Sequence, residues 1–175
     1  MARSTRGGSS AFNAVVDVSV LVPVCFENPL RADALSFVAE ALSLRRRAAI
    51  PTSAFLGAYH VATSYLGVPR AAAKAILAEL LETKSPALYE DIPVSLALEA
   101  LDYAALYGVE SWDGYLVALA LKLGAAIVYS LDKELSKVQV VEVVSPFPEE
   151  KVRAYHEYLR GVLSGRRPRR AQRSE

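Results

Sequence analysis

The sequence has only one cysteine, Cys25, among its 175 residues. A single cysteine cannot form a disulfide within the chain, and it cannot build a cysteine-based zinc site. The two histidines are not clustered in the sequence either. The composition therefore disfavours a zinc protein and a fold that depends on disulfides.

Long apolar runs are also missing. No stretch approaches the roughly 18 uninterrupted apolar residues of a membrane-spanning helix, although 53% of the residues are hydrophobic. The basic N-terminus is not followed directly by the apolar segment of a signal peptide. We therefore predict a cytoplasmic protein without a membrane partner.

The charge is nearly balanced, at +1, but it is unevenly distributed. Five arginines lie in the last ten residues: Arg166, Arg167, Arg169, Arg170 and Arg173. Without them and Glu175, 15 basic and 18 acidic residues remain. An acidic body is not typical of a duplex-DNA binder, which usually has a broad basic face. The arginine-rich tail either contacts RNA phosphates or only keeps the chain end solvated, and the sequence leaves both readings open.

Strand patterns alternate with helical patterns along the chain. Strands are predicted near residues 14–17, 48–50, 87–89, 125–129 and 138–144. Helices are predicted over 29–46, 52–66, 70–82, 93–107, 112–123 and 149–163. This alternation predicts a single α/β domain with a parallel five-stranded sheet sandwiched by helices. We expect a flexible leader over 1–11, the domain over 12–148, a C-terminal helix over 149–163 and a basic tail over 164–175.

Three aspartates occupy positions where such a fold gathers ligands, outside the C-terminal ends of the strands. Asp17 interrupts the apolar run at the end of the first strand, and Asp132 follows the fourth strand. Asp113 lies in the first turn of the helix that leads into the fourth strand. If the first and fourth strands are neighbours, the three carboxylates converge on one edge of the sheet.

Converging carboxylates repel one another unless a positive charge is present. A hard divalent cation with oxygen ligands, Mg²⁺ or Mn²⁺, would provide it and could activate water for attack on a phosphate. Taken alone, Asp113 also fits an ordinary helix-start carboxylate, and Asp132 fits a turn or cap residue. Asp17 is harder to explain in this way, because an aspartate within an apolar strand is costly without partners.

Three segments resemble the PIN-domain family, which includes the VapC-like toxin ribonucleases. The segments are VDVSVLV (16–22), YGVESWDGYLVALA (107–120) and LGAAIVYSLDK (123–133). The resemblance implies metal-dependent hydrolysis of phosphodiester bonds, mostly of RNA, with Asp17, Asp113 and Asp132 as catalytic residues and metal ligands. It also implies supporting hydroxyls from Ser19 and Ser130, an antitoxin protein as partner and a homodimer.

Two positions depart from the family pattern. Gly57 stands where the family places a glutamate on the helix after the second strand, and no acidic residue occurs between Glu40 and Glu79. Glu110 stands where a Ser or Thr helix cap is usual. It either replaces the missing carboxylate or is a solvated first-turn acid. We expect a site with weakened metal affinity, and we expect Gly57→Glu to strengthen the site and to favour the helix.

Two functions therefore remain open. The first is an endoribonuclease, as the toxin of a toxin–antitoxin pair. The second is a catalytically impaired module that binds RNA or protein. A nucleotide-binding or receiver-like domain is disfavoured, because the sequence has no GxGxxG motif, no P-loop and no paired acidic motif on its first strand.

Overall fold

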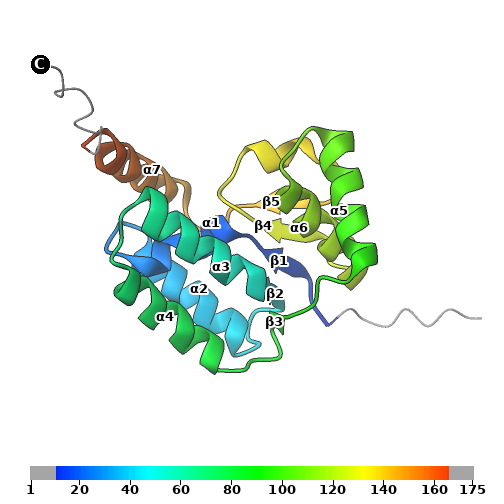
Figure 1. The fold of residues 1–175 in the computed structure, drawn as a ribbon, viewed down its shortest axis with the longest axis horizontal. Coiled ribbons are helices and arrows are strands. Elements are labelled where there is room, and N and C mark those ends of the chain that lie inside the picture. Colours follow the sequence, from blue (N-terminus) through cyan, green and yellow to red (C-terminus); the bar gives the residue numbers. More distant parts are fainter. Residues whose placement is uncertain (1–10, 166–175) are drawn as a thin grey trace, which may run out of the picture.

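A computed structural model describes residues 11–165 of the protein (Figure 1). Within these residues, five strands form one sheet in the order β3-β2-β1-β4-β5. They are β1 (Ala14–Val16), β2 (Ala48–Pro51), β3 (Leu88–Tyr89), β4 (Ile127–Tyr129) and β5 (Glu142–Val144). All pairings are parallel. The predicted α/β fold is confirmed, and β1 and β4 are neighbours, as the convergence of the aspartates requires.

Helices connect the strands on both faces of the sheet. They are α1 (Val18–Leu21), α2 (Arg31–Leu42), α3 (Thr52–His60), α4 (Arg70–Glu82), α5 (Val94–Tyr107), α6 (Ser111–Leu123) and α7 (Glu149–Ser164). Short helical turns cover Val22–Cys25, Val61–Tyr65 and Glu134–Lys137. The six predicted helices are present, but α2 is shorter than predicted, because Leu44 adopts a left-handed conformation with φ 60° and ends it.

The first strand stops earlier than its apolar pattern suggests. Val18 to Val22 are mostly β-branched, yet they form α1 and the turn that follows it. Such residues do not favour helices by themselves, but tertiary contacts override this weak preference. Val20, Leu21 and Val22 are buried here. The early end of β1 leaves Asp17 at the junction of strand and helix.

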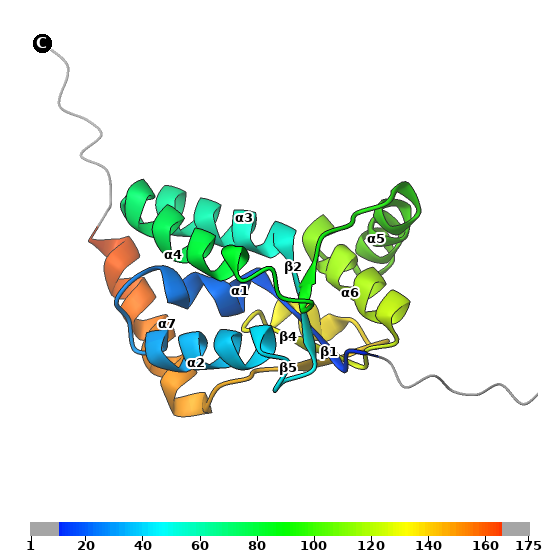
Figure 2. The same ribbon diagram turned by 90° about the horizontal axis from the view of Figure 1, so that it is seen from below.

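Side chains alternate between two cores, one on each face of the sheet. Ala14 and Val16 pack into the core shared with α1 to α4, whereas Val15 and Val128 pack with α5 and α6. Figures 1 and 2 show α5 and α6 on one side of the sheet, with α2, α3, α4 and α7 on the other. Successive side chains of β1 point to opposite faces, so a strand buried on both faces needs a continuous apolar run, as Ala14–Val16 provides.

The helix predicted over 149–163 is α7, and its Tyr155 is buried in the first core. All but the last residue of the predicted leader, and all five arginines of the tail, lie outside the described residues. The division of the chain into these parts therefore stays a prediction. In the stretch from 11 to 165, no helix is long and apolar enough to cross a membrane.

Candidate acidic site at the C-terminal edge of the sheet

Asp17 lies where β1 ends and α1 begins. Its backbone N–H donates to the Tyr129 carbonyl at 2.9 Å, which ties the ends of β1 and β4 together. Its backbone is extended, with φ −82° and ψ 158°, and it is the N-cap residue of α1. The residue is 8% exposed. A carboxylate with so little access to water needs hydrogen-bond donors from the protein.

Two serine hydroxyls provide these donors. Ser19 Oγ donates to Asp17 Oδ2 at 2.5 Å, and Ser130 Oγ donates to the same oxygen at 2.7 Å. The two hydroxyl oxygens are 3.3 Å apart. Because both donate to Oδ2, the other carboxylate oxygen, Oδ1, is left for another partner. Both serines thus turn toward Asp17 rather than into the apolar core.

The same hydroxyls also accept hydrogen bonds from the backbone after β4. The Leu131 N–H donates to Ser19 Oγ at 2.9 Å, and the Asp132 N–H donates to Ser130 Oγ at 2.9 Å. Each serine thus donates to the carboxylate of Asp17 and accepts from the segment that carries Asp132. This network holds the two aspartates in fixed relation at the edge of the sheet.

Asp132 itself is exposed. Its Oδ1 accepts a hydrogen bond from the Glu134 N–H at 2.8 Å, at the start of the turn Glu134–Lys137. Asp132 thus makes a local turn contact just before the N-cap residue Lys133, and its second oxygen remains available on the solvent side. A structural role in the turn and a role as a metal ligand are therefore compatible at Asp132.

Asp113 enters the site from the first turn of α6. Glu110 is the N-cap residue of α6 and forms a capping box with Asp113, in which the Glu110 N–H donates to Asp113 Oδ2 at 3.3 Å. Glu110 therefore acts as the helix cap, in the place where a Ser or Thr was expected. The Glu110 carboxylate is exposed, and its role as a replacement ligand stays a prediction.

The electrostatics connect Asp113 with the other two acids. Burial, and then the negative charge of Asp17, raises the pKa of the Asp113 carboxyl to about 6, and Asp132 adds to the repulsion. The three carboxylates therefore act on one another across the C-terminal edge of the sheet. Within residues 11–165, however, no three acidic, histidine or cysteine side chains are already arranged as a complete ion-binding cluster.

Gly57 faces the helix that follows Asp17. A Cβ atom built on Gly57 would lie 2.8 Å from Val18 Cγ2 and 3.3 Å from Val18 Cγ1. Real Cβ atoms essentially never come as close as 2.8 Å, so a side chain at position 57 displaces the Val18 side chain. The helical preference expected of Gly57→Glu is therefore opposed by a steric cost in the single substitution, because the contact between α1 and α3 depends on the missing Cβ.

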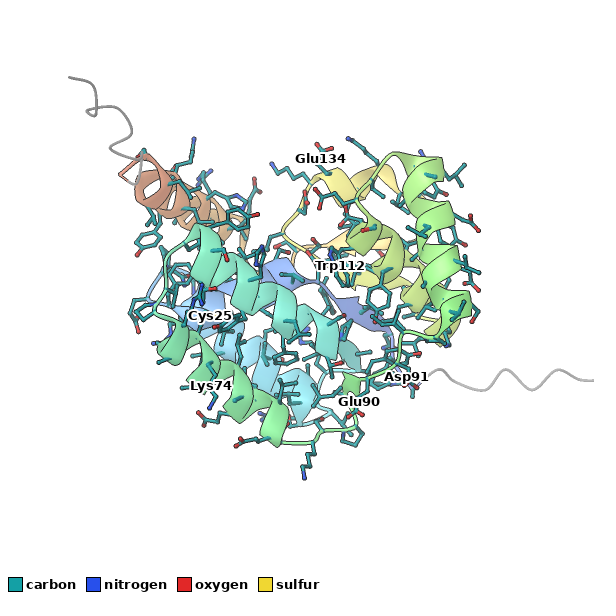
Figure 3. The ribbon with its side chains drawn as sticks, in the orientation of Figure 1. Cys25, Lys74, Glu90, Asp91, Trp112 and Glu134 are labelled. Carbon is teal, nitrogen blue, oxygen red and sulfur yellow. The ribbon has the colours of Figure 1, made fainter. Side chains whose placement is uncertain are left out.

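Trp112 is part of the second motif segment, 107–120, which by itself assigns it no role. It precedes Asp113, is 56% exposed and, together with Asp17, lines a shallow apolar crevice. Figure 3 shows Trp112 between the part of the molecule that carries α3 and the part that carries α5 and α6. The signal in the sequence was its status as the only tryptophan, next to a candidate acid.

Comparisons with known proteins agree with this architecture. A family model described as PIN domain matches residues 14–141. The crystal structure of PAE2754 from Pyrobaculum aerophilum is similar, with a TM-score of 0.54 and 20% sequence identity over 91% of this chain and 94% of that chain. At this identity the similarity concerns the fold alone. Comparison with curated proteins finds no match.

Proposed function

The chain belongs to the PIN domain family, whose members are generally nucleases, and we propose that it is a metal-dependent endoribonuclease acting through Asp17, Asp113 and Asp132. The observation that carries the proposal is the convergence at one edge of the sheet: β1 and β4 are neighbours, Ser130 links Asp17 to the backbone of Asp132, and Asp113 lies within reach of both charges. Such an arrangement is costly when ionised and becomes favourable when a cation is shared.

The donor set fits a hard divalent ion. All candidate ligands are carboxylate oxygens, which Mg²⁺ and Mn²⁺ prefer, and nearby hydroxyls are suited to hold the waters that such ions retain. When bound, the ion would supply charge stabilisation at the phosphate and an activated water. Asp17, held by Ser19 and Ser130, would present Oδ1 to the site. Asp113 and Asp132 would bind from the two flanking segments.

The missing carboxylate at Gly57 supports low activity. Val18 fills the space beside Gly57, so α3 brings no acid to the site at this position. Fewer charged ligands mean weaker ion binding. This observation also favours the second candidate function, an RNA- or protein-binding module without cleavage.

A toxin role, an antitoxin partner, a homodimer and a cytoplasmic location are further proposals, which rest on the resemblance of the motifs. Growth arrest on expression, relieved by a neighbouring gene product, would test the toxin role.

Cleavage of single-stranded RNA with Mg²⁺ and with Mn²⁺ tests the proposal directly. We expect slow cleavage by the natural protein, greater with Mn²⁺, and none by Asp17→Asn or Asp132→Asn. Asp102→Asn is the matched control, because Asp102 is an exposed aspartate on α5, outside the site. If no RNA is cut with either ion while RNA still binds, the binding module is the correct function. Equal cleavage by all variants would overturn the assignment of the site.

A second experiment tests whether the site is weakened at Gly57. Gly57→Glu alone should destabilise the protein, because its Cβ meets Val18. Adding Val18→Ala removes both close Cγ atoms, and the nearest remaining Val18 atom is then Cβ at 3.7 Å. The double variant should bind Mn²⁺ more tightly in calorimetric titration than its control, Gly57→Ala with Val18→Ala. Equal affinities would show that position 57 does not face the ion.

A further inference from the structure

A shallow crevice adjoins the acidic site. It lies between the end of β1, the start of α3 and the first turns of α6, and Asp17 forms part of its lining. The remaining lining is nearly all apolar, with Pro51 and Ala54 on one side and Trp112 and Tyr115 on the other. The crevice and the acids therefore share Asp17 and the start of α6.

Trp112 is the exposed element of this crevice. Its side chain meets Tyr115 edge to face, with ring centroids 6.1 Å apart and an interplanar angle of 85°. Tyr115 is only 4% exposed, whereas Trp112 is 56% exposed. The indole is thus held by a buried ring but presents much of its surface to solvent. Exposed aromatic rings of this kind are what bases of single-stranded nucleic acids stack on.

We propose that one unpaired nucleobase of the RNA strand stacks against the exposed part of Trp112, at the mouth of this crevice. The inference rests on the proposed function, which places the backbone phosphate at the acids. Because Asp17 and Trp112 line the same crevice, a base attached to that nucleotide lies within reach of the indole. The apolar lining offers contact with the face of a base rather than a pattern of hydrogen bonds.

This chemistry selects single-stranded over double-stranded RNA. In an A-form duplex the faces of the bases are stacked inside the helix, and only the edges and the backbone are accessible. Stacking on Trp112 requires a base with a free face, so paired RNA should not bind there. Stacking also tolerates different bases, since each has a π-face. We therefore expect recognition that needs a base but depends little on its identity.

The emission of Trp112 provides a direct test, because it is the only tryptophan in the chain. The full-length protein is titrated in EDTA, without divalent ions, so that binding is measured apart from cleavage. We expect a single-stranded RNA oligonucleotide to quench the fluorescence, whereas an abasic strand of the same length and an RNA duplex should not. Equal quenching by the abasic strand would overturn the proposal.

Variants at position 112 separate stacking from a structural role. With a labelled strand, Trp112→Ala should weaken binding about 5- to 100-fold, and Trp112→Phe should restore much of it. Tyr65→Ala is the control, because Tyr65 is an aromatic residue 61% exposed outside the crevice. Unchanged affinity of Trp112→Ala, or quenching only by an apolar peptide and never by RNA, would overturn the proposal. Base-dependent quenching without any cleavage would reject the nuclease activity and leave the base site standing.

Discussion

Removing the charge of Asp113 should stabilise the ion-free protein. The substitution is Asp113→Asn, whose side-chain oxygen can still accept the capping hydrogen bond from the Glu110 N–H. In the native chain, burial and the charge of Asp17 raise the pKa of Asp113 from 3.8 to about 6. A carboxyl whose pKa is raised by folding opposes folding when it is ionised.

The expected gain in the free energy of unfolding follows from the shift in the pKa of Asp113. Each pKa unit corresponds to about 1.4 kcal/mol, which would give an upper bound of about 3 kcal/mol. Asp113 is only half-buried, so solvent screens the repulsion, and we expect about 1 kcal/mol. The loss of a favourable charge at a helix N-terminus reduces the gain further, by a few tenths of a kcal/mol. The net gain of about 0.7 kcal/mol raises Tm by about 1–3 °C for a chain of this size.

The pH dependence distinguishes this cause from others. Well below pH 3.8 the carboxyl is protonated in both states, so the penalty is absent; it is still small near about pH 4, grows between about pH 4 and pH 6, and is complete above about pH 7. Urea unfolding in EDTA should therefore show Asp113→Asn more stable than the natural protein at about pH 7.5 and nearly equal at about pH 4. Asp102→Asn controls for general loss of negative charge. An equal gain at both pH values, or no gain at the higher one, would refute the reasoning.

Two further predictions concern the packing and the hydrogen bonds of the site. Gly114→Ala should cost about 2 kcal/mol or more and loosen the start of α6, because its Cβ would lie 2.0 Å from a backbone oxygen of α5. The control Gly161→Ala in α7, where nothing lies within 4 Å, should be neutral or stabilising in the same thermal unfolding assay. Ser130→Ala should cost about 1–3 kcal/mol and reduce cleavage, because buried Asp17 loses one of its two hydroxyl donors. Exposed Ser136→Ala should leave both measurements within error, and equal effects of the two serine variants would contradict the role of the network.

The sequence predicted the elements well where several signals agreed. The helix over 70–82 follows Pro69 and carries a run of alanines and leucines, and the structure has it at the same bounds. The helix over 93–107 ends before Gly108, which adopts the left-handed conformation. Prediction was poorer where packing decides the conformation. Val138 and Val141 are buried, but only Glu142–Val144 pair with β4, so the last strand is shorter than its apolar pattern.

The positions of the three aspartates could be read from the sequence, because each follows a strand or starts a helix that leads back to the sheet. The motif also predicted that the hydroxyls of Ser19 and Ser130 support Asp17, and both donate hydrogen bonds to it. Both hydroxyls donate to one oxygen of Asp17, from a residue two positions away and from one 113 positions away. This arrangement and the capping role of Glu110 depend on side-chain geometry. Sequence spacing alone carries no information about such geometry.

The sequence by itself determined the parallel α/β architecture, since buried β-branched strands and amphipathic helices leave little other way to cover both faces of a sheet. It also indicated which acids lie at the C-terminal edge of the sheet. Only the tertiary structure decided what surrounds them: the close approach of Val18 to Gly57, the raised pKa of Asp113 and the crevice beside Trp112. These properties arise from contacts between elements far apart in the chain, and their magnitudes depend on distances and burial that no local pattern encodes.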